Sequence, residues 1–220
     1  MIGAWLRRFF ASDNDAAAPQ AANDLPGELN DEIAEELREY IHREVWGGYS
    51  DREGAIEFGV EMFVDQADAA LLRPISERLV DEALANHARE AVGWPDVTDC
   101  DRLDSAFESL EQVGIVARQN FTCCGTCGTA AIWDEIGVDD AVSGSKRGYA
   151  FFHQQDTERG VDCDGIYLNY GACAEGEAAA VAIGHEIVDH LERAGLRTDW
   201  DGDLGRRIGV SLDWKRRRPN

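Results

Sequence analysis

Three of the six cysteines lie within five residues, in the segment 121–128, which reads Phe-Thr-Cys-Cys-Gly-Thr-Cys-Gly. Cys124 and Cys127 have the Cys-x-x-Cys spacing of half a zinc site, and Gly128 permits the tight turn that such a site needs. No second Cys-x-x-Cys pair follows, so the remaining ligands must come from other positions. The sequence predicts that the metal ligands are Cys123, Cys124, Cys127 and His153.

The other three cysteines are weaker candidates for that site. Cys100 precedes Leu103 and Phe107 by three and seven residues, which is the spacing of a buried helix face, so it is typical of a packed apolar thiol. Cys163 and Cys173 lie farther along the chain and are more remote alternatives.

The same segment also fits thiol chemistry without a metal. A Cys-x-x-Cys pair at the start of a helix has a lowered thiol pKa, and residues 130–134 can form that helix. Against this alternative, the chain has no strand–helix–strand unit of the thioredoxin type before the pair. A third alternative is a hydrolase in which Cys124 or Cys127 acts with His153 and Asp156. However, His153 falls in a predicted strand, where a histidine is more often a hydrogen-bonded core residue.

Charge excludes several classes of partner. The 220 residues include 43 acidic and 21 basic side chains, a net charge of −22. Such a chain repels nucleic acid and anionic lipid over most of its surface. The basic run at residues 215–218 (Lys-Arg-Arg-Arg) is expected to dock on the protein's own acidic surface. The partner is therefore expected to be a protein or a small molecule, and no nucleic acid.

The location follows from the hydropathy pattern. No run approaches the ~20 apolar residues of a membrane helix, so no transmembrane segment is expected. The first ten residues have no apolar core of secretory type, and a cytoplasmic location with reduced thiols is therefore predicted. Residues 2–10 do carry apolar side chains at helical spacing, which predicts a short amphipathic helix with Arg7 and Arg8 off its apolar face.

The chain divides into three parts by composition. Residues 1–28 are small, polar and interrupted by proline, which predicts a flexible tail and linker. Residues 29–95 carry apolar side chains at helical spacing, which predicts a helical subdomain. Its first helix is expected to start at Asn30, its second at a capping box formed by Ser50 and Glu53, and its third at Pro74.

Residues 96–220 are predicted to form an α+β domain that carries the cysteine segment. Thr98 and Asp101 open its first helix as a capping box, and a long helix is expected over 177–194. Twofold alternation predicts strands near 115–118, 149–154, 166–170, 198–200 and 208–214. The expected fold class is α+β, with a helical N-terminal subdomain followed by a mixed or antiparallel sheet and one or two helices on a face.

Several short motifs occur together in this half: Asp101-Arg102-Leu103-Asp104, Asn120-Phe121-Thr122-Cys123-Cys124, His153-Gln154-Gln155-Asp156-Thr157, Tyr170-Gly171, Trp200-Asp201-Gly202 and Arg207-Ile208. In this combination the chain resembles a bacterial family common in actinobacteria, domain of unknown function 6891, over about residues 30–214. The resemblance implies no activity and no catalytic residue. The leading prediction is a non-enzymatic binding or regulatory domain with a structural zinc site, and the alternative is a thiol-disulfide redox protein that uses Cys124 and Cys127.

Overall fold

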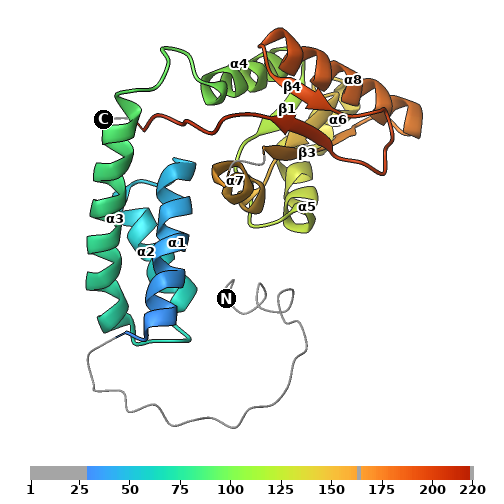
Figure 1. The fold of residues 1–220 in the computed structure, drawn as a ribbon. Coiled ribbons are helices and arrows are strands. Elements are labelled where there is room, and N and C mark those ends of the chain that lie inside the picture. The colour runs from blue at the N-terminus through green and yellow to red at the C-terminus, as the bar shows by residue number, and fades with distance from the viewer. Residues whose placement is uncertain (1–28, 163–164, 219–220) are drawn as a thin grey trace, which may run out of the picture. The chain divides into compact units, whose positions relative to one another are not determined.

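The structure, a computed structural model, describes residues 29–162 and 165–218. These residues form helices α1 to α8 and strands β1 to β5 (Figure 1). They divide into two compact units, one containing the described residues up to Val45 with Ser50–His87, and the other containing Trp46–Tyr49 with residues from Ala88 onward. The predicted tail and amphipathic segment at 1–28 lie outside the described residues. The predicted boundary between residues 95 and 96 stays a prediction.

The helical unit is formed by α1 (Asp31–Gly47), α2 (Arg52–Phe63) and most of α3 (Ala69–Ala91). Asn30 accepts the Glu32 N–H at 2.8 Å and so caps α1 as predicted. The other two predicted starts were wrong. Asp51, rather than Ser50, caps α2 by accepting the Gly54 N–H at 2.8 Å, because its carboxylate reaches the third helical residue.

The third helix begins before its proline. Asp68 accepts the Ala70 N–H at 2.8 Å, and α3 then continues through Pro74. An internal proline loses one backbone hydrogen bond. The buried side chains of Leu72 and Leu79, on either side of Pro74, hold both parts of α3 in one packed helix.

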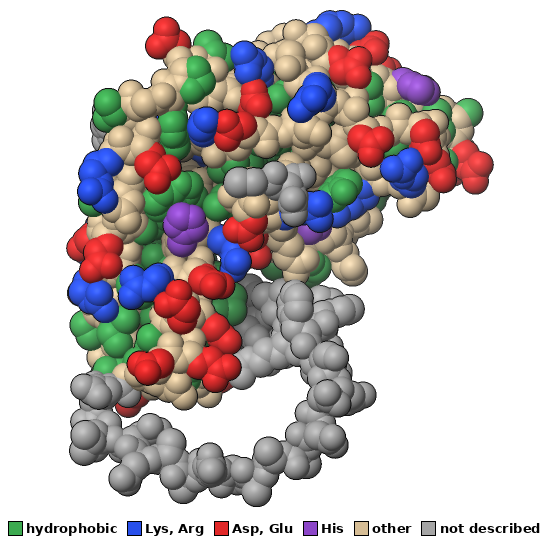
Figure 2. All heavy atoms as spheres, in the orientation of Figure 1, with side chains coloured by type: hydrophobic (Ala, Val, Ile, Leu, Met, Phe, Trp, Pro, Cys, Tyr) green, Lys and Arg blue, Asp and Glu red, His purple; other side chains and the backbone are tan. Residues whose placement is uncertain are grey.

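Apolar side chains fill the interior of this unit, and ion pairs cover its surface. The buried set is Leu37, Ile41, Val45, Ala55, Ile56, Phe63, Leu72, Leu79, Val80 and Ala83. Acidic and basic side chains are interspersed over its visible face (Figure 2), and arginines such as Arg73 and Arg78 pair with Glu53 and Glu82. These exposed pairs contribute little stability each, typically below about 1 kcal/mol.

The second unit is built on a five-stranded mixed sheet with the order β1-β2-β3-β5-β4. Its strands are β1 (Ile115–Arg118), β2 (Gly148–Phe151), β3 (Ile166–Ala172), β4 (Arg197–Asp199) and β5 (Ile208–Ser211). β1 and β2 are parallel, and every other neighbouring pair is antiparallel. An α+β fold with helices at its N-terminal end and a mixed sheet is therefore confirmed.

Helices cover both faces of this sheet. α4 (Asp99–Gln112) and α8 (Glu177–Arg193) pack on one face, and α5 (Gly125–Ile136) lies on the other (Figure 1). The larger core lies under α4 and α8 and includes Leu103, Phe152 and Leu191. A smaller core under α5 joins Ile132 and Ile136 to strand side chains such as Val116 and Phe151. The capping box of α4, formed by Thr98 and Asp101, is present as predicted.

Two short helices were not predicted. α6 (Val138–Ser143) follows α5, and α7 (Gln154–Val161) follows β2. The second changes the interpretation of His153, because β2 ends at Phe151 and His153 caps α7 instead of continuing the strand. The strand predicted over 149–154 therefore ends three residues early. The His153 side chain accepts the Asp156 N–H and starts a helix instead.

The C-terminal segment is tied to the second unit by its basic residues. Arg216 donates two hydrogen bonds to the Asp104 carboxylate, at 2.8 and 3.1 Å, and a third to Gln119 Oε1 at 2.7 Å. Its guanidinium also lies 4.6 Å from the Tyr49 ring centroid, and its side chain is only 12% exposed. Arg217 pairs with Asp101 at 2.9 Å. The expected docking of this basic run on an acidic surface is present for these two arginines.

None of the helices within residues 29–162 and 165–218 is long and apolar enough to cross a membrane.

We predict that Arg216→Ala lowers the free energy of unfolding by about 3 kcal/mol, because the largely buried guanidinium loses its hydrogen bonds to Asp104 and Gln119 and its contact with the Tyr49 ring. Arg217→Ala is the matched control, and its more exposed pair predicts a loss below about 1 kcal/mol. Urea unfolding of the two variants measures the difference. Equal losses would show that the tail does not depend on the buried contact.

Candidate functional site

The cysteine segment lies at one end of the sheet, where two neighbouring parallel strands finish. The loop of residues 119–124 leaves β1, and the loop of residues 152–153 leaves β2. The carboxyl ends of parallel strands are a common place for binding sites, because the loops that follow them gather side chains from separate parts of the chain. Here the two loops bring the cysteines, His153 and Asp156 to the carboxyl ends of β1 and β2.

Hydrogen bonds between the two loops fix the cysteine segment. The Phe121 N–H donates to the Phe152 carbonyl at 2.8 Å, and the Gln154 N–H donates to the Thr122 carbonyl at 3.1 Å. The Thr157 hydroxyl donates to Asn120 Oδ1 at 2.8 Å. The segment is thus shaped by contacts with the neighbouring loop.

These contacts also hold two residues in an uncommon conformation. Asn120 and Thr122 have φ values of 49° and 61°, in the left-handed region that few residues other than glycine adopt. Asparagine adopts this region more readily than most residues, whereas the β-branched Thr122 does so at a cost of about 1–2 kcal/mol. Backbone strain of this kind is concentrated at binding and catalytic sites, and here it lies just before the first cysteine.

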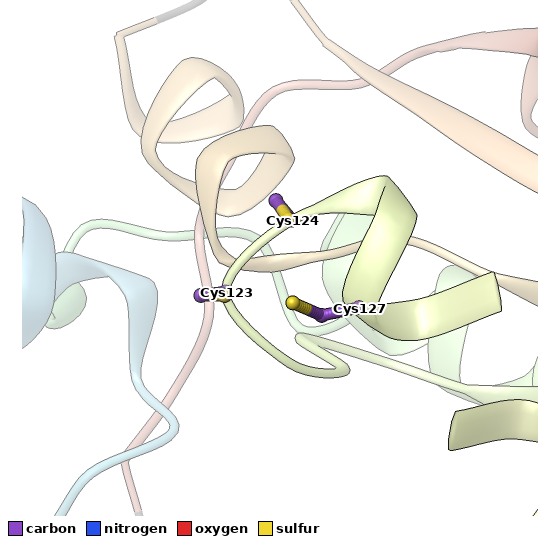
Figure 3. Close-up of side chains that lie close together, drawn as sticks. All are labelled: Cys123, Cys124 and Cys127. Atoms are coloured by element: carbon purple, nitrogen blue, oxygen red, sulfur yellow. The ribbon is translucent and has the colours of Figure 1, made fainter. Parts of the chain in front are cut away.

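Cys123, Cys124 and Cys127 come together at the start of α5. Their sulfur atoms all lie within 4.8 Å of one another, and Figure 3 shows the three side chains converging from the loop and the first helical turn. Zinc holds its sulfur ligands at about 2.3 Å, which places tetrahedral neighbours about 3.8 Å apart. A shift of about 1 Å or less would therefore bring the three sulfurs onto one ion.

The three thiols differ in exposure, and two of them, Cys124 and Cys127, have shifted pKa values. Cys124 is the N-cap residue of α5, and although its side chain makes no capping hydrogen bond, the N–H of Cys127 lowers the pKa of its thiol. The neighbouring thiols of Cys127 and Cys123 lower it further. The Cys127 proton is shared with the sulfurs of Cys123 and Cys124, which raises the pKa of Cys127 to about 11. Cys127 is exposed, and the other two are half-buried.

His153 lies beside the loop but outside this group of sulfurs. A Cβ atom at Gly125 would stand 3.6 Å from His153 Nε2, so the imidazole adjoins the start of α5. Among the described residues, however, the group of mutually close ligand atoms consists of the three cysteines only. The structure thus brings Cys123, Cys124 and Cys127 together and does not place His153 with them. Metal binding by these four residues stays a prediction.

Both ring nitrogens of His153 already have partners. Nδ1 accepts the Asp156 N–H at 3.3 Å, which assigns the proton of the neutral ring to Nε2. Nε2 lies 3.0 Å from Asp156 Oδ2 and 3.3 Å from Arg207 Nη1. Burial lowers the pKa of His153, and Asp156 opposes this effect while Arg207 adds to it. The His153–Asp156 pair that a hydrolase would use is therefore present. The ring nitrogens of His153 do not belong to the group of mutually close sulfur atoms.

The part played by Arg207 depends on the fold and does not follow from its sequence motif. Its guanidinium bonds to Asp156 at 2.9 Å and lies 5.0 Å from the Tyr167 ring centroid. Arg159 lies at 4.9 Å from the same ring. Arg207 stands directly before β5, and β5 pairs with β3. The Arg207-Ile208 motif marked the position, but only the strand register brings it to His153.

Of the remaining cysteines, two pack in or against the apolar cores and one lies outside the described residues. Cys100 lies on the buried face of α4, where burial raises its pKa to about 12, so the predicted apolar packing is present. Cys173 is half-buried against the smaller core, and burial raises its pKa as well. Cys163 lies outside the described residues.

A close contact seats the first turn of α5 on the sheet. A Cβ atom at Gly128 would stand 2.4 Å from Cε2 of Phe151, so only glycine fits at this position without movement. Gly128 was predicted to permit a tight turn, and its role in the structure is this close approach between helix and strand. The contact fixes the distance of Cys127 and Cys124 from the sheet.

The fold and the site define an α+β domain with a cluster of three cysteines at the start of a helix. The family model named Domain of unknown function (DUF6891) matches residues 30–218, and the chain therefore belongs to this family, as its motifs predicted. No curated protein and no solved structure matches the chain.

We predict that iodoacetamide modifies Cys124 before Cys127, although Cys127 is the more exposed thiol. The reactive form is the thiolate, so the lowered pKa of Cys124 favours its reaction below the ordinary cysteine pKa of about 8.5. Cys173 is the internal control, because its pKa is raised by burial. Peptide mass spectrometry after labelling across a range of pH measures the order. If Cys127 were labelled first, Cys124 would not be the more acidic thiol.

Proposed function

We propose that this domain is a non-enzymatic binding or regulatory module that holds a zinc ion at Cys123, Cys124 and Cys127. The observation that carries the proposal is the mutual approach of the three sulfur atoms within 4.8 Å. Thiolates are the ligands that structural zinc prefers, and the Cys-x-x-Cys spacing is typical of half a zinc site. The lowered pKa of Cys124 supports binding, since the ligand must be deprotonated.

The zinc ion would serve a local structural role. It would join the loop that contains Cys123 to the first turn of α5, which contains Cys127. Both parts are already positioned by hydrogen bonds and by the Gly128–Phe151 contact. The metal is therefore expected to stiffen a formed site rather than to fold the domain, and a cytoplasmic location would keep its thiols reduced.

We predict about one zinc ion per chain in protein purified without added metal, and a loss of affinity of at least about 100-fold in Cys127→Ser. Removal of a residue that only supports a ligand already costs 10- to 100-fold. Cys173→Ser is the matched control, because Cys173 lies outside the cluster. Elemental analysis and competition with a chromophoric chelator give the values. Equal affinity in the two variants would refute the site.

A second function is favoured by the position of Cys124. A thiol of lowered pKa at the N-cap of α5, three residues before a second thiol, is the arrangement of a thiol-disulfide redox site. The Cys124 thiolate would attack a disulfide substrate, form a mixed disulfide and expel the first substrate thiolate. Cys127 would then lose its proton and attack the Cys124 sulfur, which expels the second substrate thiolate. The substrate is reduced to two thiols, and the Cys124–Cys127 disulfide forms.

We predict that, under this second function, treatment with a small disulfide removes two free thiols per chain, and a dithiol restores them. Bound zinc should protect both cysteines, because the two functions use the same sulfurs. Thiol counting and mapping of the disulfide measure the reaction with and without a chelator. Oxidation that joins separate chains, or that leaves Cys124 free, would contradict this function.

A further inference from the structure

Three sulfur ligands leave one position of a tetrahedral ion to be filled. We propose that the metal ion held by Cys123, Cys124 and Cys127 keeps its fourth position open to solvent and takes there a thiolate ligand from outside the domain. The inference rests on the proposed metal binding and concerns what completes the site. It replaces the predicted fourth ligand, His153, with one that the described chain does not supply.

The hydrogen bonds of His153 argue against its serving as that ligand. A histidine binds a metal through the lone pair of a neutral ring nitrogen. The Nδ1 lone pair receives the Asp156 N–H, and Nε2 carries the proton that faces the Asp156 carboxylate at 3.0 Å. Binding through Nε2 would require the loss of this proton contact beside Arg207, whose charge lies 3.3 Å away. Binding through Nδ1 would remove the cap of α7.

The other ligand types within the described residues do not fill the position either. No aspartate, glutamate or histidine of residues 29–162 and 165–218 joins the three sulfurs at mutual distances within 4.8 Å. Cys100 is buried in the core under α4, and Cys173 packs against the core under α5. Neither sulfur belongs to the group of mutually close ligand atoms.

The exposure of the cluster places the open position toward solvent. Cys123 and Cys124 are half-buried, whereas Cys127 is exposed, so the side of the ion away from the loop is accessible. The loop keeps its shape through its bonds to Phe152 and Gln154, and it does not need a fourth ligand to close. Catalytic zinc sites show that three protein ligands can hold the ion while its fourth position stays exchangeable, and the proposed site uses that coordination without a catalytic role.

The chemistry of the three ligands selects the incoming group. An ion bound by soft thiolates accepts a further soft ligand readily, and four thiolates form a common zinc site. A carboxylate or phosphate is a harder ligand, and a chain of net charge −22 repels such anions before they arrive. An incoming thiol would give its proton to solvent and displace one water molecule from the ion. The source is either a small thiol or a cysteine of another protein.

The test uses the full-length protein loaded with Co²⁺ in place of zinc. The reductant is a phosphine, so that the buffer itself contains no thiol. The d–d absorption of Co²⁺ reports the ligand set. We expect 2-mercaptoethanol to shift this absorption and to add thiolate-to-metal charge-transfer intensity. The S-methyl ether of 2-mercaptoethanol is the matched control and should change nothing. A peptide with one cysteine, used in parallel, distinguishes a protein source from a small-thiol source.

Two variants identify any fourth ligand that the chain itself provides. His153→Asn keeps a residue that can cap α7, and circular dichroism verifies its fold. We expect its Co²⁺ spectrum to match that of the unmodified protein before thiol is added. Cys163→Ser makes the same comparison for a cysteine outside the described residues. A changed spectrum in either variant, or no response to 2-mercaptoethanol, would overturn the open position. A protein that binds no Co²⁺ at all would instead overturn the metal site.

Discussion

The pairing of two loops is the constraint on which the site depends. The loop after β1 and the loop after β2 exchange hydrogen bonds through Phe121 and Phe152, and through Gln154 and Thr122. These bonds offset the cost of the left-handed conformations at Asn120 and Thr122. Because the bonds come from the backbone, the shape of the cysteine loop depends on the parallel pairing of β1 and β2.

That constraint separates the two halves of the candidate site. The sulfurs of Cys123, Cys124 and Cys127 face one another at the start of α5. The polar group of His153, Asp156 and Arg207 lies beside them, with its hydrogen bonds directed mainly within itself. The sulfurs of the first group lie close enough together to hold a metal ion, and the second group links α7 to the residue before β5. None of the ligand atoms of this polar group lies within 4.8 Å of all three sulfurs.

Much of the fold could be predicted from local signals. The capping box of Thr98 and Asp101 and the regular apolar spacing of α8 have short-range causes, and both were predicted. The starts of α2 and α3 were misplaced because several residues near each start can cap a helix, and only the folded chain selects Asp51 and Asp68. α7 was missed because its cap is a histidine, whose alternation with its neighbours imitated a strand.

The candidate site was predictable to the extent that its residues are close in sequence. The cysteines lie within five residues, so their approach needed only a turn and a helix start. The position of Arg207 depends on the register between β3 and β5, and that of His153 on where β2 ends. Both are consequences of the assembled sheet, which local spacing does not encode.

The contact between Gly128 and Phe151 has a consequence for how this chain can vary. With no room for a methyl group between helix and ring, the two positions form a size-matched pair. A larger residue at 128 is compatible with the fold only if a smaller side chain replaces the phenyl ring at 151. Such an exchange would remove apolar volume from the core under α5. A substitution at position 128 is therefore tolerated only together with a compensating substitution at position 151.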